Sequence, residues 1–222
     1  MTKQVLYLTY PSGTRSDLEF AMRPIEQLQQ DGLLLKSDTV LPSVATLIAG
    51  MPVRGSWWAH PASHAIFRAI DELASRRDVV VVKLIGGKDT FVYSRLWPEL
   101  LAIAAAREQW QVSNLPRSAL NLYKRLLRSG ELEASGSDAR LLESRLLVRA
   151  EQVHTDAGHH EKRLESWERW LERTGLPESS IPSAQEAKDT FERIYPGAKW
   201  PWRALRSGHR RLFKSGAARS RR

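Results

Sequence analysis

Residues 53–108 read VRGSWWAHPASHAIFRAIDELASRRDVVVVKLIGGKDTFVYSRLWPELLAIAAARE, and this stretch decides the fold that we expect for the chain. Its first part predicts a helix that begins at Pro61 or Ser63, because proline is tolerated in a first helical turn and serine is a good N-cap. From Ile66 to Ala74 apolar side chains recur at helical spacing, with charged side chains on the other faces. The pattern predicts one amphipathic helix that continues to Arg77.

A β-hairpin is expected directly after this helix. Val79 to Ile85 is a run of β-branched and aliphatic residues that only Lys83 interrupts, and Thr90 to Tyr93 has the same character. Gly86-Gly87 between the two runs is a turn signal. Leu96-Trp97-Pro98 then predicts the start of another helix, so helix, hairpin and helix follow one another closely.

The segment upstream completes an order of elements that is known from one superfamily. Leu41-Pro42-Ser43 precedes a short predicted helix from Val44 to Ala49, and Gly50 is placed to end it. Short helix, turn, longer helix and hairpin, over roughly residues 40 to 95, resemble winged-helix DNA-binding domains. The resemblance implies DNA binding, although winged helices also serve as protein-binding and structural modules. Leu33-Leu34-Leu35 is expected to pair as a strand beside the wing.

The rest of the chain predicts helices. Apolar residues have helical spacing in residues 17–29, 118–128, 139–153, 160–173 and 183–195. The segment SALNLYKRLLRSGELEAS (118–135) also reads as a helix running into a short strand, so a second helix-turn-helix-like unit is an alternative to a helical hairpin. We expect a mainly α protein with a small β-hairpin, in which a winged-helix-like unit is joined to a helical C-terminal half. The expected domains are a winged-helix-like domain with an N-terminal arm (1–112), a helical domain (113–197) and a basic tail (198–222).

The formal net charge of +9 is unevenly distributed along the chain. From Arg193 to Arg222 there are ten basic residues and no acidic one, which leaves 24 of the 34 basic residues against all 25 acidic residues in the part before Arg193. Basic side chains neutralise phosphates, and the interleaved Trp200, Trp202 and Phe213 are suited to stacking on bases. The tail therefore predicts contact with nucleic acid, and a disordered, solubilising extension is the alternative.

Several classes of protein are not indicated. The chain has no cysteine, so it has no disulfide framework and no thiolate metal site. The N-terminal MTKQVLYLTY lacks the apolar core of ~7–15 residues that a signal peptide needs. No apolar run approaches the ~20 residues that cross a bilayer. Ile85-Gly86-Gly87-Lys88 lacks the spacing of a phosphate-binding loop. A cytoplasmic protein with no membrane partner and no cofactor is expected.

Three groups of side chains are candidates for specific roles. His60 and His64 are four residues apart, the spacing at which two imidazoles share a metal on one helix, but Pro61 argues against a regular turn there. We expect these histidines to cap, to hydrogen-bond or to lie on the surface, and predict no metal site. Trp57-Trp58 either stacks on an exposed base or fills a junction in the core, and we favour the core. The acidic residues that an enzyme would place in a cleft are Glu143, Glu151, Asp156 and Glu161, of which none is assigned as catalytic.

The leading interpretation is a DNA-binding protein without assigned catalysis, with RNA as an alternative partner. The predicted contacts are Arg68, Arg76 and Arg77 from the helix, Lys83 and Lys88 from the wing, and Arg203, Arg206, Arg210, Arg211 and Lys214 from the tail. One alternative is an enzyme that processes nucleic acid, such as a winged-helix DNA glycosylase, with a carboxylate or histidine from residues 151–161. The other is a protein-interaction module whose basic tail only solubilises it.

Overall fold

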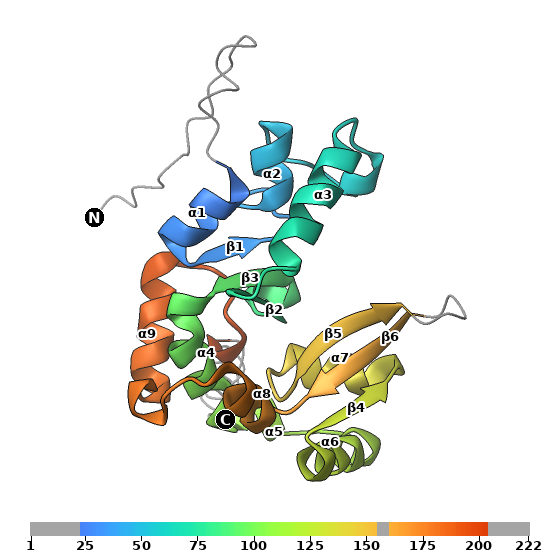
Figure 1. Cartoon of the computed structure of the whole chain (residues 1–222), viewed down its shortest axis with the longest axis vertical. Coiled ribbons are helices and arrows are strands. Elements are labelled where there is room, and N and C mark those ends of the chain that lie inside the picture. The colour runs from blue at the N-terminus through green and yellow to red at the C-terminus, as the bar shows by residue number, and fades with distance from the viewer. Residues whose placement is uncertain (1–22, 155–159, 204–222) are drawn as a thin grey trace, which may run out of the picture.

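The computed structural model describes residues 23–154 and 160–203. These residues form an N-terminal unit, a C-terminal unit and a group of helices that packs between them (Figure 1). In the described ranges, no helix has the length and the hydrophobicity that crossing a membrane requires.

The N-terminal unit combines helices with a three-stranded antiparallel sheet. In chain order it consists of α1 (Pro24–Asp31), β1 (Leu33–Leu35), α2 (Val44–Ala49), η2 (Trp57–Ala59), α3 (Ser63–Ala74), β2 (Val79–Lys83), η3 (Ile85–Gly87) and β3 (Asp89–Tyr93). The strand order is β1-β3-β2, and Phe91 in the central strand lies opposite both Leu34 and Val81. The predicted hairpin and the predicted pairing of residues 33–35 beside it are therefore confirmed.

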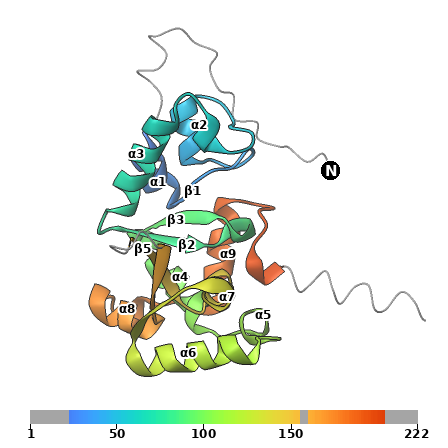
Figure 2. The ribbon, with the colours of Figure 1, turned by 90° about the vertical axis from the view of Figure 1, so that its right-hand side faces the viewer.

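Both faces of this sheet are buried, which explains its nearly continuous run of valines. Leu34, Val79 and Phe91 pack against α1, α2 and α3 on one face. Val80 and Val92 pack on the other face against the helices between the two units. Figures 1 and 2 show these two layers, with α1, α2 and α3 on one side of the sheet and α4 and α9 on the other.

The helices between the units contain most of the tryptophan in the core. They are η4 (Ser94–Leu96), α4 (Trp97–Ala105), α5 (Gln109–Val112), α8 (Trp167–Thr174), η5 (Glu178–Ser180), α9 (Ala184–Ile194) and η6 (Pro201–Arg203). Trp97 and Trp170 meet edge to face at 4.9 Å between ring centroids. Trp200 and Trp202 are buried and stacked on each other at 5.1 Å. Residues 198–203, expected to begin a basic tail, thus belong to the folded core.

The C-terminal unit contains a second sheet that the helical spacing did not predict. It consists of α6 (Arg117–Ser129), β4 (Glu131–Ala134), α7 (Gly136–Ser144), β5 (Arg149–His154) and β6 (His160–Glu165), with strand order β4-β6-β5. The expectation of an all-helical C-terminal half is therefore wrong, although helices still predominate in the chain. The alternative of a helix running into a short strand at residues 118–135 is the one that the structure adopts.

Two features explain why the chain forms strands here and not one continuous helix: the backbone conformation of one residue and the pairing across the sheet. Leu142, Leu146 and Ala150 have helical spacing, but Leu146 adopts a left-handed φ of 52°, which ends α7 before the strand begins. In the sheet, Ala150 and Leu164 lie opposite each other, and Leu164 belongs to the core of the C-terminal unit. Cross-strand pairs between distant residues stabilise this sheet, and they are not visible in the local spacing.

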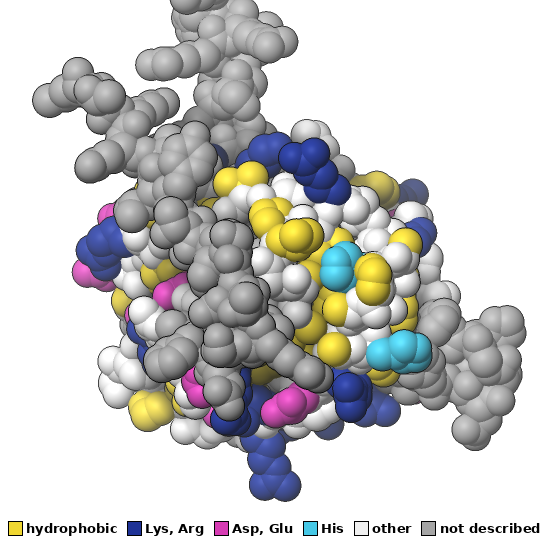
Figure 3. All heavy atoms as spheres, turned by 90° about the horizontal axis from the view of Figure 1, so that it is seen from above, with side chains coloured by type: hydrophobic (Ala, Val, Ile, Leu, Met, Phe, Trp, Pro, Cys, Tyr) yellow, Lys and Arg dark blue, Asp and Glu magenta, His cyan; other side chains and the backbone are white. Residues whose placement is uncertain are grey.

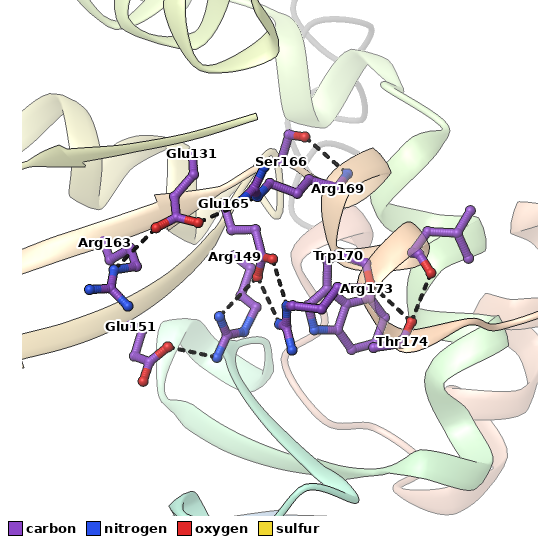
Figure 4. A network of polar contacts seen from close by, with 11 residues as sticks. Glu131, Arg149, Glu151, Arg163, Glu165, Ser166, Arg169, Trp170, Arg173 and Thr174 are labelled. Atoms are coloured by element: carbon purple, nitrogen blue, oxygen red, sulfur yellow. Dashed lines mark hydrogen bonds and ion pairs between the residues drawn. The ribbon is translucent and has the colours of Figure 1, made fainter. Parts of the chain in front are cut away.

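A buried ion-pair network ties the second sheet to α8 (Figure 4). Glu165 at the end of β6 accepts two hydrogen bonds of 2.9 Å from Arg173 on α8 and one of 3.0 Å from Arg149 on β5. Burial by itself raises the pKa of Glu165, but hydrogen bonds from Arg173 and the charges of both arginines outweigh it, so the pKa lies below its usual value. Glu165 is therefore a charged anchor between sheet and helix.

Candidate nucleic-acid interface

One end of the N-terminal unit carries an exposed cluster of aromatic side chains. Trp57 is buried, whereas Trp58, stacked on it at 4.0 Å, is 61 % exposed. Phe67 on α3 lies 5.6 Å from Trp58 between ring centroids and is 46 % exposed. Trp57 thus lies in the core, as favoured from the sequence, whereas Trp58 lies at the surface.

The local chain explains how Trp58 is presented. Gly55 adopts a φ of +77°, which turns the chain into η2, and the backbone N–H of His60 donates to the carbonyl of Trp57 at 3.1 Å. The ring Nδ1 of His60 then accepts from the backbone N–H of Ala62 at 3.1 Å, just before α3 begins at Ser63. His60 therefore hydrogen-bonds to the backbone just before α3, which is one of the roles expected for these histidines.

Two exposed arginines belong to the same part of the chain as the aromatic cluster. Between Asp38 and Asp71 the sequence contains no acidic residue, but it contains Arg54 and Arg68, both exposed. His64, Phe67 and Arg68 lie on neighbouring positions of α3, three and four residues apart. We call Arg54, Trp58, His64, Phe67 and Arg68 the tip surface. Figure 3 looks onto this end of the molecule, where hydrophobic and histidine side chains lie together with basic side chains nearby.

The predicted wing residues are placed differently from the expectation of a free wing. Lys83 pairs with Asp89 at 2.5 Å, and Lys88 pairs with Asp38 at 2.7 Å. The loop of the hairpin packs onto the C-terminal segment, because Ile85 is buried and the N–H of Gly86 donates to the carbonyl of Lys199 at 2.8 Å. The hairpin loop is thus held against the C-terminal segment, and its cations Lys83 and Lys88 are neutralised by nearby carboxylates.

The other predicted contacts divide into three groups. Arg76 lies beyond the end of α3 and binds Asp78 through two hydrogen bonds, which hold the pKa of Asp78 below its usual value. Arg203 pairs with Glu192. Arg68 and Arg77 are exposed and form no ion pair within residues 23–154 and 160–203. The remaining four, Arg206, Arg210, Arg211 and Lys214, lie outside the described residues.

A cleft of about 400 Å³ lies between the two units, where the edge strands β2 and β5 face each other. Its charged lining residues are Lys36, Asp71, Lys83 and Asp89 on one wall and Glu143, Arg149, Glu151 and Lys162 on the other. Each wall therefore has two cations and two carboxylates. The ion pairs stay within a wall, as in Arg149–Glu151 at 3.1 Å and Lys162–Glu143. The cleft is polar but electrically balanced.

This balance bears on the enzyme alternative. A basic pocket around a carboxylate of strongly shifted pKa would favour catalysis on nucleic acid. Glu151 does line the cleft, but its carboxylate is paired with Arg149, and Glu143 is paired with Lys162. Asp156 and the side chain of Glu161 lie outside what the structure describes. In the described ranges, no three His, Asp or Glu side chains gather as metal ligands do.

No protein-family model matches the chain, and neither a curated protein nor a solved structure is significantly similar to it.

Proposed function

We propose that the chain binds nucleic acid, and duplex DNA in particular, through the tip surface. The observation that carries this proposal is the exposed Trp58–Phe67 pair in a stretch that has no acidic residue. Arg54 and Arg68 belong to the same stretch, and neither forms an ion pair with any residue that the structure describes. In a duplex, exposed aromatic rings insert as wedges between base steps, and arginines neutralise phosphates. The same combination is uncommon on a purely structural surface, where large aromatics are buried.

The order of elements supports the same proposal. Helix, strand, two helices and a hairpin, with strand order β1-β3-β2, follow the winged-helix pattern, and we propose that the N-terminal unit is of this type. The C-terminal unit has the corresponding strand order, β4-β6-β5, with one helix fewer. In helix-turn-helix proteins the N-terminal residues of the recognition helix contact base edges. His64, Phe67 and Arg68 occupy that part of α3.

The test is binding of a fluorescent 25-mer duplex to Trp58→Ala and Arg68→Ala, measured by anisotropy at two salt concentrations. We expect each variant to lose about 1–3 kcal/mol of binding free energy, the usual contribution of one aromatic ring against a base or one bidentate arginine. Arg193→Ala is the matched control, because Arg193 is an exposed arginine on α9 far along the chain from the tip surface. It should bind as the wild type does.

The basic tail is tested by a chain that ends at Arg203. This end point keeps the buried Trp200 and Trp202, whereas an end point at Pro196 would remove core residues. Residues 204–222 contain seven basic residues. For every phosphate that these residues neutralise in the full chain, the slope of log K against log salt should be about 0.9 shallower in the shortened chain.

Two results would count against the proposal. If Trp58→Ala and Arg68→Ala bind as tightly as Arg193→Ala, the tip surface is not the interface. If the wild type binds no duplex at low salt, duplex DNA is not the partner. The apolar part of the tip surface then points to a protein partner, as in the interaction-module alternative.

A further inference from the structure

A second stretch without acidic residues contains α6, and none of the predicted contacts includes it. From Gln109 to Gly130 the sequence contains no Asp or Glu, while α6 itself carries Arg117, Lys124, Arg125 and Arg128. All four are exposed, and none pairs with a carboxylate in the described ranges. The wing cations Lys83 and Lys88, in contrast, are neutralised by a nearby aspartate, so α6 differs from the wing.

The two sides of α6 have different roles. Ala119, Tyr123 and Leu126 are buried in the core of the C-terminal unit. Arg117, Lys124 and Arg128 follow one another at helical spacing on the outer side, with the partly exposed Leu120 and Leu127 between them. From Arg117 to Arg128 the helix rises about 16 Å, at ~1.5 Å per residue. Together with Arg125 beside them, these three cations form a cationic strip, which we call the α6 strip.

The dimensions of the α6 strip fit a nucleic-acid backbone. Duplex DNA carries about one negative charge per 1.7 Å of its axis, so a length of ~16 Å presents roughly nine phosphates to four cations. A membrane surface fits less well. A helix that lies in a membrane interface inserts a broad apolar face, whereas α6 buries Ala119, Tyr123 and Leu126 in the protein core and leaves only Leu120 and Leu127 partly exposed.

The α6 strip and the tip surface belong to opposite ends of the molecule. In Figures 1 and 2, which share a vertical axis, α2 and the start of α3 lie at one end of that axis and α6 lies at the other. We propose that the α6 strip is a second nucleic-acid surface that contacts phosphates, so one molecule holds two separate duplex segments. This inference rests on the proposed function only in that the tip surface binds the first of the two duplex segments.

The test is a bridging assay with the full chain. A duplex attached to beads captures a second, fluorescent duplex only when the protein binds both. The variant is Lys124→Gln, Arg125→Gln and Arg128→Gln together. Its matched control is Arg23→Gln, Arg95→Gln and Arg193→Gln, which removes the same charge from exposed positions outside the strip. Circular dichroism melts check that both variants fold.

We expect the α6 variant to reduce capture at least tenfold while it still binds a single duplex, and the control to capture as the wild type does. Capture that is equal in the two variants overturns the inference and assigns any bridging to another part of the chain. If the α6 variant loses binding to vesicles of anionic lipid but captures duplex normally, the strip is a membrane contact and the inference is again overturned.

The outcomes separate this inference from the proposed function. If Trp58→Ala has no effect on duplex binding but the α6 variant abolishes it, the tip surface fails as the interface, and the strip is the single duplex site, which overturns the inference of two segments. If Trp58→Ala weakens binding and the α6 variant captures normally, the tip surface stands and the strip fails.

Discussion

Replacing Glu165 by glutamine tests how the second sheet is held to α8. The glutamine keeps the shape of the side chain, but it removes the negative charge and directs an amide NH2 toward guanidinium groups. Glu165 is 4 % exposed in its side chain and accepts three hydrogen bonds, two from Arg173 and one from Arg149. These contacts are drawn in Figure 4.

The expected loss follows from the exposure of the partners. Removing one member of a buried ion pair costs about 3–5 kcal/mol when the other member stays buried without a partner. Here Arg173 is 54 % exposed, so water solvates part of its charge when the carboxylate of Glu165 is removed. We therefore expect the free energy of unfolding to fall by about 2–3 kcal/mol. Glu151→Gln is the control, because Glu151 also pairs with Arg149 but is 52 % exposed, and it should cost less than ~1 kcal/mol.

The stability that Glu165 contributes should decrease as the pH falls. The pKa of Glu165 is lower in the folded protein than its usual value of 4.5, so the unfolded chain binds the proton more readily. The stabilisation by Glu165 is therefore complete above about pH 4.5 and is lost as the pH falls through the lower, folded-state pKa. The difference between wild type and Glu165→Gln should shrink in acid.

The assay is urea unfolding followed by circular dichroism at pH 7 and at several values below about pH 4.5. The reasoning is refuted if Glu165→Gln is no less stable than Glu151→Gln at pH 7. It is also refuted if the gap between Glu165→Gln and wild type is as large in acid as at pH 7.

Two further predictions concern the core. Trp200→Ala should lower the free energy of unfolding by about 3–5 kcal/mol because Trp200 is fully buried, whereas Trp58→Ala, which removes an exposed ring, should cost under ~1 kcal/mol; equal losses would contradict the burial of Trp200. Gly32→Ala should cost about 1–3 kcal/mol, since Gly32 has a φ of +81° and an added Cβ would lie 2.6 Å from Cδ1 of Leu96. Thermal melts at one protein concentration measure both, and an unchanged midpoint for Gly32→Ala would show that the backbone relaxes there.

Local sequence signals are sufficient to predict a helix or turn when residues a few positions away in the chain stabilise it. The helix from Val44 to Ala49 is predicted with its true ends, because the hydroxyl of Ser43 accepts from the N–H of Thr46 and Gly50 takes a left-handed conformation. The hairpin is predicted from its valines and its Gly-Gly turn, and both glycines have a positive φ. These features depend on residues a few positions apart.

The second sheet could not be predicted in this way. The strands that contain Arg149 and Glu165 are polar, and their stability comes from partners across the sheet. The spacing of Leu164, Trp167 and Leu171 predicts one helix over residues 160–173, but the chain is a strand up to Glu165 and a helix from Trp167. The change occurs at Ser166, whose hydroxyl caps α8 by accepting from the N–H of Arg169.

For the candidate site, the sequence by itself determined where charge is absent and where it accumulates. The stretches without acidic residues, 39–70 and 109–130, are visible in the sequence alone. Only the tertiary structure decided which residues of these and other segments reach the surface. Trp57 is buried and Trp58 exposed, and Lys88 is neutralised by Asp38, fifty positions away in the chain. Composition depends on each residue separately, whereas exposure and ion pairing depend on distant segments that folding brings together.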